Sequence, residues 1–108
     1  MKGFVELKKK KMTVKDIKDK IIKYVGNTDY SDWYVGITND IDRRLFQEHG
    51  VNKDTDYWVW CQANNKTDAQ TVEEYFLDLG MDGDTGGGND DTTYVYVFKK
   101  NGHTDPRS

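Results

Sequence analysis

The stretch from Trp33 to Gly50, WYVGITNDIDRRLFQEHG, places a tyrosine and an arginine where they can act together. Its first part is rich in aromatic and β-branched residues, which predicts a strand over 33–38, and helical spacing follows after a polar turn. Tyr34 on the strand and Arg44 on the helix then meet at one end of this unit. A tyrosine can relay a proton and an arginine can bind phosphate through its forked guanidinium, so the pair suits chemistry on a phosphate group.

Local signals set the limits of the helix in this unit. Ile41 and Leu45 are four residues apart and share one face. Thr38 or Asn39 can cap the N-terminus of the helix, and Gly50 can end it.

The rest of the chain predicts short elements that position this unit. They are a helix over 14–24, a strand over 57–63, a helix from Thr67 to Leu79 and a strand over 92–100. Two N-terminal capping signals support the helices, namely Thr13 with Asp16 and Thr67 with Gln70. The order predicts an α+β fold, with a three-stranded, mostly antiparallel sheet flanked by helices and an extra N-terminal helix.

The second predicted helix has an apolar stripe with a carboxylate at its edge. The stripe residues are Ala69, Val72, Phe76 and Leu79. At about 100° per residue, Glu73 lies at the margin of this stripe, where it can face a cleft, whereas Glu74 points nearly opposite into solvent.

Aromatic residues make up 13% of the chain, enough for a modest two-layer core despite a hydrophobic content of 35%. Trp58 and Trp60 share one face of the predicted strand over 57–63. They are interpreted as core or sheet-face residues, with base stacking as the alternative.

Length and charge indicate one domain with two tails. We assign residues 1–12 to a basic N-terminal tail, 13–100 to the domain and 101–108 to a polar C-terminal tail. The net charge of -3 argues against a strongly basic nucleic-acid-binding module, yet residues 1–25 hold nine Lys against three acidic residues. Lys8 to Lys11 are either a solvated tail or a sequence-independent contact to phosphate.

Cysteine content and hydropathy bear on where the protein works. Cys61 is the only cysteine, which excludes an intrachain disulfide and favours a reducing compartment. No apolar run approaches the ~20 residues of a membrane span, and no apolar segment follows the N-terminal charges. We therefore expect a cytoplasmic protein that does not contact a membrane.

The run Tyr34-Val35-Gly36, with Arg44 ten residues after the tyrosine and Glu73 four residues after Ala69, resembles the GIY-YIG nuclease family. In that family the second strand carries Y-[IV]-G, the next helix presents the arginine and a later helix presents a metal-binding glutamate. The resemblance implies a metal-dependent endonuclease that hydrolyses phosphodiester bonds of DNA or another nucleic acid. Tyr34, Arg44 and Glu73 would be catalytic, and Glu73 would bind a single Mg²⁺ or Mn²⁺.

Other parts of the family's site have displaced counterparts in this chain. The family's histidine usually follows the arginine by four residues, but His49 follows Arg44 by five, which on an α-helix turns it to another face. No GIY strand precedes Trp33. If the strand over 92–100 takes its place, Tyr94 or Tyr96 supplies the family's first tyrosine. Asn89 is the nearest match to the family's late asparagine.

Two other classes of function remain open. One is a catalytically silent binding or interaction module of the same fold, since fold does not determine function. The other is a plain nucleic-acid binder that uses Lys8 to Lys11. In either case Arg44 can simply pair with Glu48 one turn later, and Glu73 can be an ordinary acidic residue on a helix surface.

Overall fold

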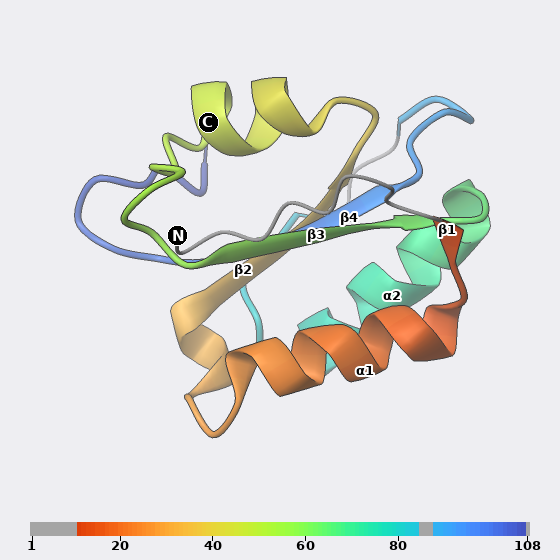
Figure 1. The fold of residues 1–108 in the computed structure, drawn as a ribbon, viewed down its shortest axis with the longest axis horizontal. Helices are drawn as coiled ribbons and strands as arrows, with labels where there is room; N and C mark the ends of the chain where they lie inside the picture. The colour runs from red at the N-terminus through yellow and green to blue at the C-terminus, as the bar shows by residue number, and fades with distance from the viewer. Residues whose placement is uncertain (1–10, 85–87, 108) are drawn as a thin grey trace.

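The protein folds into three layers, a helical segment, a sheet and a pair of helices (Figure 1). The computed structural model describes residues 11–84 and 88–107. In chain order the elements are β1 (Lys11–Met12), α1 (Val14–Val25), η1 (Tyr30–Asp32), β2 (Trp33–Thr38), η2 (Asp42–Glu48), β3 (Trp58–Ala63), α2 (Lys66–Asp78) and β4 (Tyr94–Lys99). The sheet separates η2 on one face from α1 and α2 on the other, as Figure 1 shows. The predicted α+β class is confirmed.

The sheet has four strands, in the order β1-β3-β4-β2. β4 pairs antiparallel with both β2 and β3, whereas β1 runs parallel to β3, with Lys11 opposite Gln62. The prediction of a three-stranded sheet is therefore wrong, and the sheet is mixed. The missed strand, β1, has only two residues and follows a run of lysines, so it is too short to show strand alternation. It also uses the last two residues of the predicted N-terminal tail.

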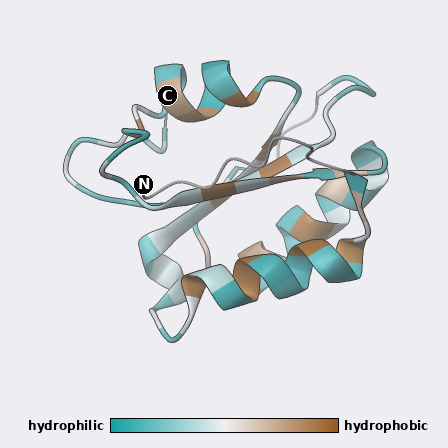
Figure 2. Ribbon diagram, in the orientation of Figure 1, coloured by the Kyte–Doolittle hydropathy of each residue, from teal (hydrophilic) through white to brown (hydrophobic). Residues whose placement is uncertain are grey.

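α1 packs on the lower face of the sheet through one apolar side. Its N-terminus is capped as predicted, since the Thr13 hydroxyl accepts a hydrogen bond from the Asp16 amide at 3.1 Å. Ile17, Ile21 and Val25 are buried, and Figure 2 shows hydrophobic and hydrophilic residues alternating along this helix. Burying each of these side chains stabilises the fold by about 2 kcal/mol.

α2 begins and ends slightly earlier than predicted. Asn65, rather than Thr67, caps it, because the Asn65 side chain accepts a hydrogen bond from the Asp68 amide at 2.8 Å. The stripe residues Ala69, Val72 and Phe76 are buried as predicted. Leu79 lies beyond the helix end and is 46% exposed, so its assignment to the stripe is wrong.

η2 is a π-helix rather than an α-helix. The His49 amide donates a hydrogen bond to the Arg44 carbonyl at 3.0 Å, across five residues. Residues joined in this way lie one above the other along the helix axis. The expectation that His49 is turned away from Arg44 holds only for an α-helix and is wrong here, because the π geometry accommodates the additional residue between them.

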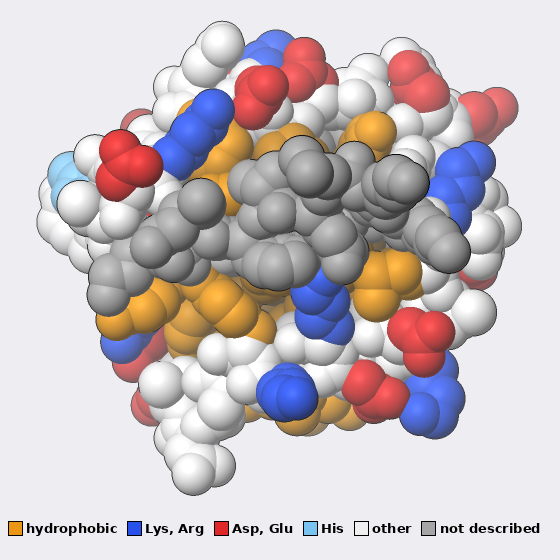
Figure 3. Space-filling view, viewed as in Figure 1, with side chains coloured by type: hydrophobic (Ala, Val, Ile, Leu, Met, Phe, Trp, Pro, Cys, Tyr) orange, Lys and Arg blue, Asp and Glu red, His pale blue; other side chains and the backbone are white. Residues whose placement is uncertain are grey.

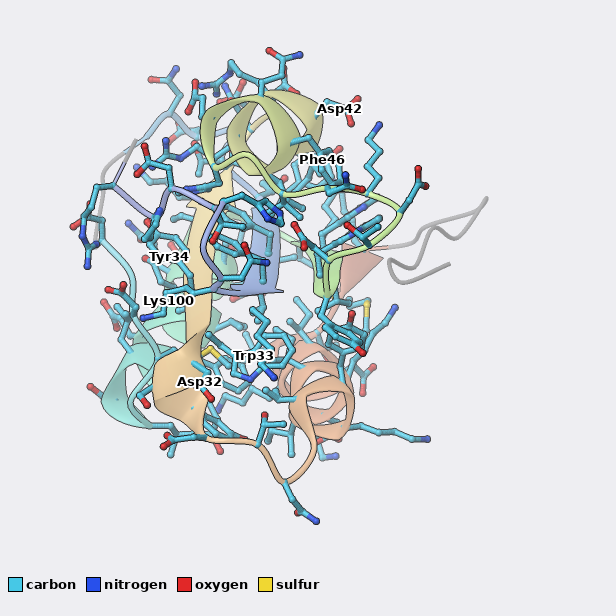
Figure 4. The ribbon with its side chains drawn as sticks, turned by 90° about the vertical axis from the view of Figure 1, so that its left-hand side faces the viewer. Asp32, Trp33, Tyr34, Asp42, Phe46 and Lys100 are labelled. Atoms are coloured by element: carbon cyan, nitrogen blue, oxygen red, sulfur yellow. The ribbon has the colours of Figure 1, made fainter. Side chains whose placement is uncertain are left out.

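η2 and the upper face of the sheet enclose a second, smaller core. Its buried members are Tyr34, Leu45, Val51, Trp58, Tyr96 and Phe98. Figure 4 shows that neighbouring residues of β2 serve the two cores, with Tyr34 nearer η2 and Trp33 directed toward α1. The Trp33 indole donates to the Thr28 hydroxyl at 2.8 Å and packs edge-on against Tyr24.

The C-terminal residues return to the η2 side of the molecule. The Asp105 amide donates to the His49 carbonyl at 2.8 Å. His103 lies 2.6 Å from the Asp56 carboxylate, which also accepts from Asn101 at 3.0 Å. The segment predicted as a polar tail therefore packs against the loop before β3 and against the end of η2.

In the described ranges, no helix has the length and apolar character required to cross a lipid bilayer.

Gly36 determines how closely β2 and β4 approach on the η2 side. It pairs with Tyr96, whose ring crosses over it. A Cβ at this position would overlap the ring and hydroxyl of Tyr96. The glycine of the YVG run is therefore needed so that the Tyr96 phenol can lie across β2.

We expect Gly36→Ala to lower the free energy of unfolding by roughly 1–3 kcal/mol, because the new methyl group must displace the buried Tyr96 ring. Gly102→Ala is the matched control, since a Cβ at Gly102 would meet nothing within 4 Å. Urea denaturation of both variants measures the effect. Equal stability of the two variants would contradict the close packing described.

Candidate active site

Tyr34, His49 and Tyr96 form a buried cluster where the end of η2 meets β2 and β4. All three are at most 1% exposed. The His49 ring centroid lies 4.8 Å from that of Tyr34 and 5.6 Å from that of Tyr96. The two tyrosine rings are roughly parallel, with centroids 6.2 Å apart. The sequence prediction that a β4 tyrosine lies beside Tyr34 thus matches the position of Tyr96.

The hydrogen bonds of His49 determine its tautomer. Its Nδ1 lies 2.8 Å from the Asp105 carbonyl oxygen, which can only accept, so Nδ1 carries the proton. Nε2 then has a free lone pair and accepts a hydrogen bond from the Tyr96 hydroxyl at 2.8 Å. Burial lowers the pKa of the imidazole, with the hydrogen bond to the Asp105 carbonyl partly offsetting this shift, so His49 is neutral at pH 7.

Arg44 borders the cluster and connects it to solvent. Its guanidinium donates to the Glu48 carboxylate at 2.7 Å, which is the pairing expected from their spacing. Burial raises the pKa of Tyr34, and the charge of Arg44 and its hydrogen bond to the phenol oppose this shift. Burial and, after it, Tyr34 raise the pKa of Tyr96, and the same guanidinium opposes this rise. Both phenols are therefore protonated at neutral pH.

A cavity of about 290 Å³ opens beside Arg44. Its lining includes Arg43, Glu48, Thr38 and Asn89. Arg43 donates to the other oxygen of Glu48 at 3.0 Å. Asn89, the nearest match to the family's late asparagine, thus lies on the same cavity as Arg44. A phosphate group entering here meets two guanidinium groups.

Glu73 lies in the interior rather than in an open cleft. Its side chain is 2% exposed, and its Oε2 has no hydrogen-bond partner among the described residues. Burial, together with the charges of Glu74 and Asp84, raises the pKa of this carboxyl to about 7. The charge of Glu73 in turn contributes to the raised pKa of Tyr96, after burial and Tyr34. Glu73 is therefore electrostatically coupled to the tyrosine cluster.

Asp84 is a residue that the sequence analysis did not identify. Its charge helps to raise the pKa of both Glu73 and Tyr34, after burial in each case, so it lies within electrostatic range of both. The only sequence signal was its position in a run of glycines and acidic residues, which gives no indication of its neighbours.

Carboxylate oxygens such as those of Glu73 and Asp84 are the ligand type that a divalent cation needs. No group of three or more His, Cys, Asp or Glu side chains with metal-ligand geometry occurs within residues 11–84 and 88–107. Mg²⁺ needs fewer protein ligands, because it is commonly held by one or two carboxylates together with water and substrate phosphate. Glu73 Oε2 is a buried carboxylate oxygen that has no hydrogen-bond partner among the described residues, and the charge of Asp84 acts on it after burial and Glu74.

Tyr94 lies apart from this cluster. Its ring packs edge-on against Trp60, with centroids 5.5 Å apart, and it borders a different cavity. Of the predicted residues, the structure therefore brings together Tyr34, Arg44, His49 and Tyr96, couples Glu73 to them through its charge, and separates Tyr94.

A scan against protein-family models gives no match for this chain, and comparisons with curated proteins and with solved structures give no significant match either. The resemblance to GIY-YIG nucleases therefore depends on the residues quoted above and on their arrangement.

We expect Glu73→Gln to stabilise the protein more as the pH rises. The folded-state pKa of about 7 is above the ordinary 4.5, so the unfolded chain loses this proton first and wild-type stability falls between those pH values. The stability difference between variant and wild type should grow by about 3 kcal/mol from pH 4.5 to pH 8. Urea denaturation at several pH values measures it, with Asp78→Asn as the α2 control; parallel pH profiles would contradict a buried Glu73.

We expect ¹⁵N NMR of the imidazole to show His49 neutral and protonated on Nδ1 at pH 7. Tyr96→Phe should leave this tautomer in place, because the Asp105 carbonyl fixes the proton from the other side. A wild-type imidazole protonated on Nε2 would reverse the direction of the Tyr96 hydrogen bond and contradict the assignment.

Proposed function

We propose that this chain hydrolyses phosphodiester bonds of DNA or another nucleic acid in a metal-dependent reaction. The observation that carries the proposal is the hydrogen-bonded pair of Tyr96 and His49, next to Tyr34 and Arg44. A hydroxyl whose proton is accepted by a neutral histidine, held in turn by a third group, is the arrangement used to activate an oxygen nucleophile.

In the proposed reaction Arg44 binds the non-bridging oxygens of the scissile phosphate. Its guanidinium already contacts the Glu48 carboxylate, and phosphate replaces or shares that contact. Positive charge at this point stabilises the transition state as negative charge develops on the phosphate. Arg43, on the same cavity, increases the local attraction for the anionic backbone.

The buried pair then moves the proton of the attacking water. Tyr96 accepts a proton from water while its own hydroxyl proton passes to Nε2 of His49, so the imidazole becomes positively charged. The Asp105 carbonyl holds the ring in place during this transfer. Water attacks phosphorus, the P–O bond to the leaving group breaks, and the released oxygen takes up a proton from solvent, while the proton on His49 returns to solvent through Tyr96 as the site resets. Tyr34, protonated and beside Arg44, donates a hydrogen bond to a phosphate oxygen.

Glu73 and Asp84 would hold the cation. When bound, Mg²⁺ or Mn²⁺ would supply positive charge that lowers the pKa of water and offsets charge on the leaving oxygen. Burial and, after it, the negative charges of Glu74 and Asp84 disfavour the ionised form of Glu73, and such a cation would offset both. Mg²⁺ should therefore stabilise the wild type at pH 8, and Glu73→Gln should not respond.

The burial of the proposed site favours a catalytically silent module as the second candidate. Tyr34, Tyr96 and His49 are almost fully buried, and Arg44 is paired with Glu48. On the face seen in Figure 3, Lys and Arg side chains are scattered among acidic ones rather than gathered in one patch. The run Lys8 to Lys11, for which a solvated tail and a phosphate contact are the two alternatives, lies, apart from Lys11, outside the described residues.

We expect cleavage of labelled duplex, nicked, branched or single-stranded DNA in the presence of Mg²⁺ or Mn²⁺, and its loss with a chelator. Arg44→Ala and Tyr96→Phe should each reduce the rate by roughly 100-fold or more. The matched controls are Lys23→Ala, which removes an exposed positive charge from the last turn of α1, and Tyr94→Phe, whose ring packs on Trp60. Both controls should cleave within about tenfold of wild type.

Three outcomes separate the candidates. Cleavage that is lost in Tyr96→Phe but not in Tyr94→Phe supports the proposal. No cleavage of any substrate favours the silent module. Cleavage that survives Arg44→Ala and Tyr96→Phe contradicts the assignment of the site, even if the protein is a nuclease.

A further inference from the structure

Asp56 is a buried carboxylate that the proposed hydrolysis does not use. It lies near the end of the loop before β3 and is 5% exposed. An ionised carboxylate is tolerated in such a place only where hydrogen-bond donors or positive charges compensate for the water that it has lost. The partners of Asp56 therefore indicate its role.

Donor groups from two separate parts of the chain converge on this carboxylate. Its Oδ2 accepts a hydrogen bond from the Asn52 amide at 2.8 Å and lies 2.6 Å from Nε2 of His103. Its Oδ1 accepts from the Asn101 side chain at 3.0 Å. Burial raises the pKa of this carboxyl, but these contacts outweigh burial and hold the pKa below its ordinary value. Asp56 is therefore ionised at neutral pH and joins the loop before β3 to the C-terminal segment.

The C-terminal segment that Asp56 contacts is a tight turn with hydrogen bonds of its own. The Asn101 side-chain oxygen accepts from the amides of His103 and Thr104, at 3.0 and 3.2 Å. The Thr104 hydroxyl accepts from the Asn101 amide at 3.0 Å. Asn101 therefore serves both contacts, because its side-chain nitrogen binds Asp56 and its side-chain oxygen shapes the turn.

This turn brings the main chain of Asp105 to His49. In Figure 1 the chain after β4 runs beside the loop before β3 and ends near η2. The Asp105 amide donates to the His49 carbonyl and the Asp105 carbonyl accepts from Nδ1, both at 2.8 Å. Asp105 follows His103 by two residues, which span at most about 7 Å. A displacement of the turn from Asp56 is therefore passed on to the Asp105 carbonyl.

A second attachment of the segment lies beyond Asp105 but is exposed. Arg107 donates to both oxygens of the Asp82 carboxylate, at 2.8 and 3.0 Å. The Arg107 side chain is 61% exposed, whereas Asp56 is buried. Exposed ion pairs contribute little, because water competes for both partners. The contact with Asp56 is therefore the stronger constraint on the segment.

We propose that Asp56 is a positioning residue for His49. Through the C-terminal turn it holds the Asp105 carbonyl on Nδ1, which leaves Nε2 to accept from the Tyr96 hydroxyl. The inference rests on the proposed function, in which His49 accepts the Tyr96 proton, but the positioning itself is measured without DNA. Asp56 acts through the turn rather than on the reacting groups, so its effect is on the tautomer and orientation of the imidazole.

The first test is ¹⁵N NMR of the imidazole in the full chain carrying Asp56→Asn, at pH 8. Asn keeps the shape of the side chain but has one acceptor oxygen in place of two, so it cannot bind all of its present donors. The Nε2-protonated form of His49 should appear in this variant, whereas wild type should show the Nδ1-protonated form alone. Asp54→Asn is the matched control, since it makes the same change at an exposed position of the same loop, and it should match wild type.

Two further variants keep the test decisive if Asp56→Asn does not fold. Asn101→Ala removes the link between Asp56 and the turn at an exposed position, and it should change the His49 tautomer in the same direction. Arg107→Gln removes the exposed attachment and should leave the Nδ1 proton in place. Urea denaturation is measured beside the NMR, because a purely structural Asp56 would lower the free energy of unfolding without changing the His49 signals.

Cleavage assays separate this inference from the proposed function. Asp56→Asn should lower kcat for DNA about tenfold or more with KM unchanged, because a misplaced imidazole slows proton transfer rather than binding. A changed tautomer in a chain that cleaves no substrate would support the positioning and contradict the hydrolysis. Cleavage by wild type, with an unchanged tautomer in folded Asp56→Asn, would do the reverse.

Two results would overturn the proposal. One is a His49 imidazole that stays protonated on Nδ1 alone in folded Asp56→Asn or, if that variant does not fold, in Asn101→Ala. The other is a tautomer change in Asp54→Asn or Arg107→Gln as large as the change in these variants.

Discussion

The hydrogen bond between Tyr96 and His49 connects the sheet to the η2 layer. Three features of the fold make this hydrogen bond possible. The phenol reaches His49 because Gly36 lets its ring cross β2. His49 faces the phenol because η2 is a π-helix. The imidazole has the correct tautomer because the C-terminal segment places a carbonyl on its other nitrogen. Loss of any one of these features leaves a buried polar group without its partner, at a cost of about 1–3 kcal/mol.

The two faces of the sheet perform different tasks. The face toward α1 and α2 is an apolar core of mostly aliphatic side chains together with Trp33 and Phe76, and its packing stabilises the fold. The face toward η2 holds tyrosines, a histidine and tryptophans, so its interior combines large buried area with polar groups that must be paired. Glu73 is the exception, since it is a titratable group from an α2 helix that otherwise serves the apolar core.

Local signals in the sequence were sufficient for most of the fold. The Thr13 cap and the apolar spacing of α1 act within one or two turns, so they could be predicted without knowledge of the tertiary structure. β1 could not, because two residues carry no periodicity and their pairing with β3 is decided by distant residues. Asn65 rather than Thr67 caps α2, although both side chains can accept a hydrogen bond from a helix amide, so the sequence alone did not distinguish them.

The candidate site was predictable only where side-chain identity carries the information. Tyr34, Arg44 and Tyr96 stand out by type and spacing, and the structure places them together. The contribution of Asp105 comes from its main-chain carbonyl, which every residue has, so no sequence pattern could reveal it. The same holds for Asp84, whose proximity to Glu73 depends on how the chain turns after α2.

The π-helical turn also limits how this chain can change in length. Surface connections generally tolerate inserted or deleted residues, because their ends can adjust without disturbing a core. Between Arg44 and His49 this freedom is absent, since one residue fewer or one more would rotate the imidazole away from the guanidinium and from the phenol below it. Related sequences that keep this site should therefore vary in residue type along η2 more readily than in the number of residues it contains.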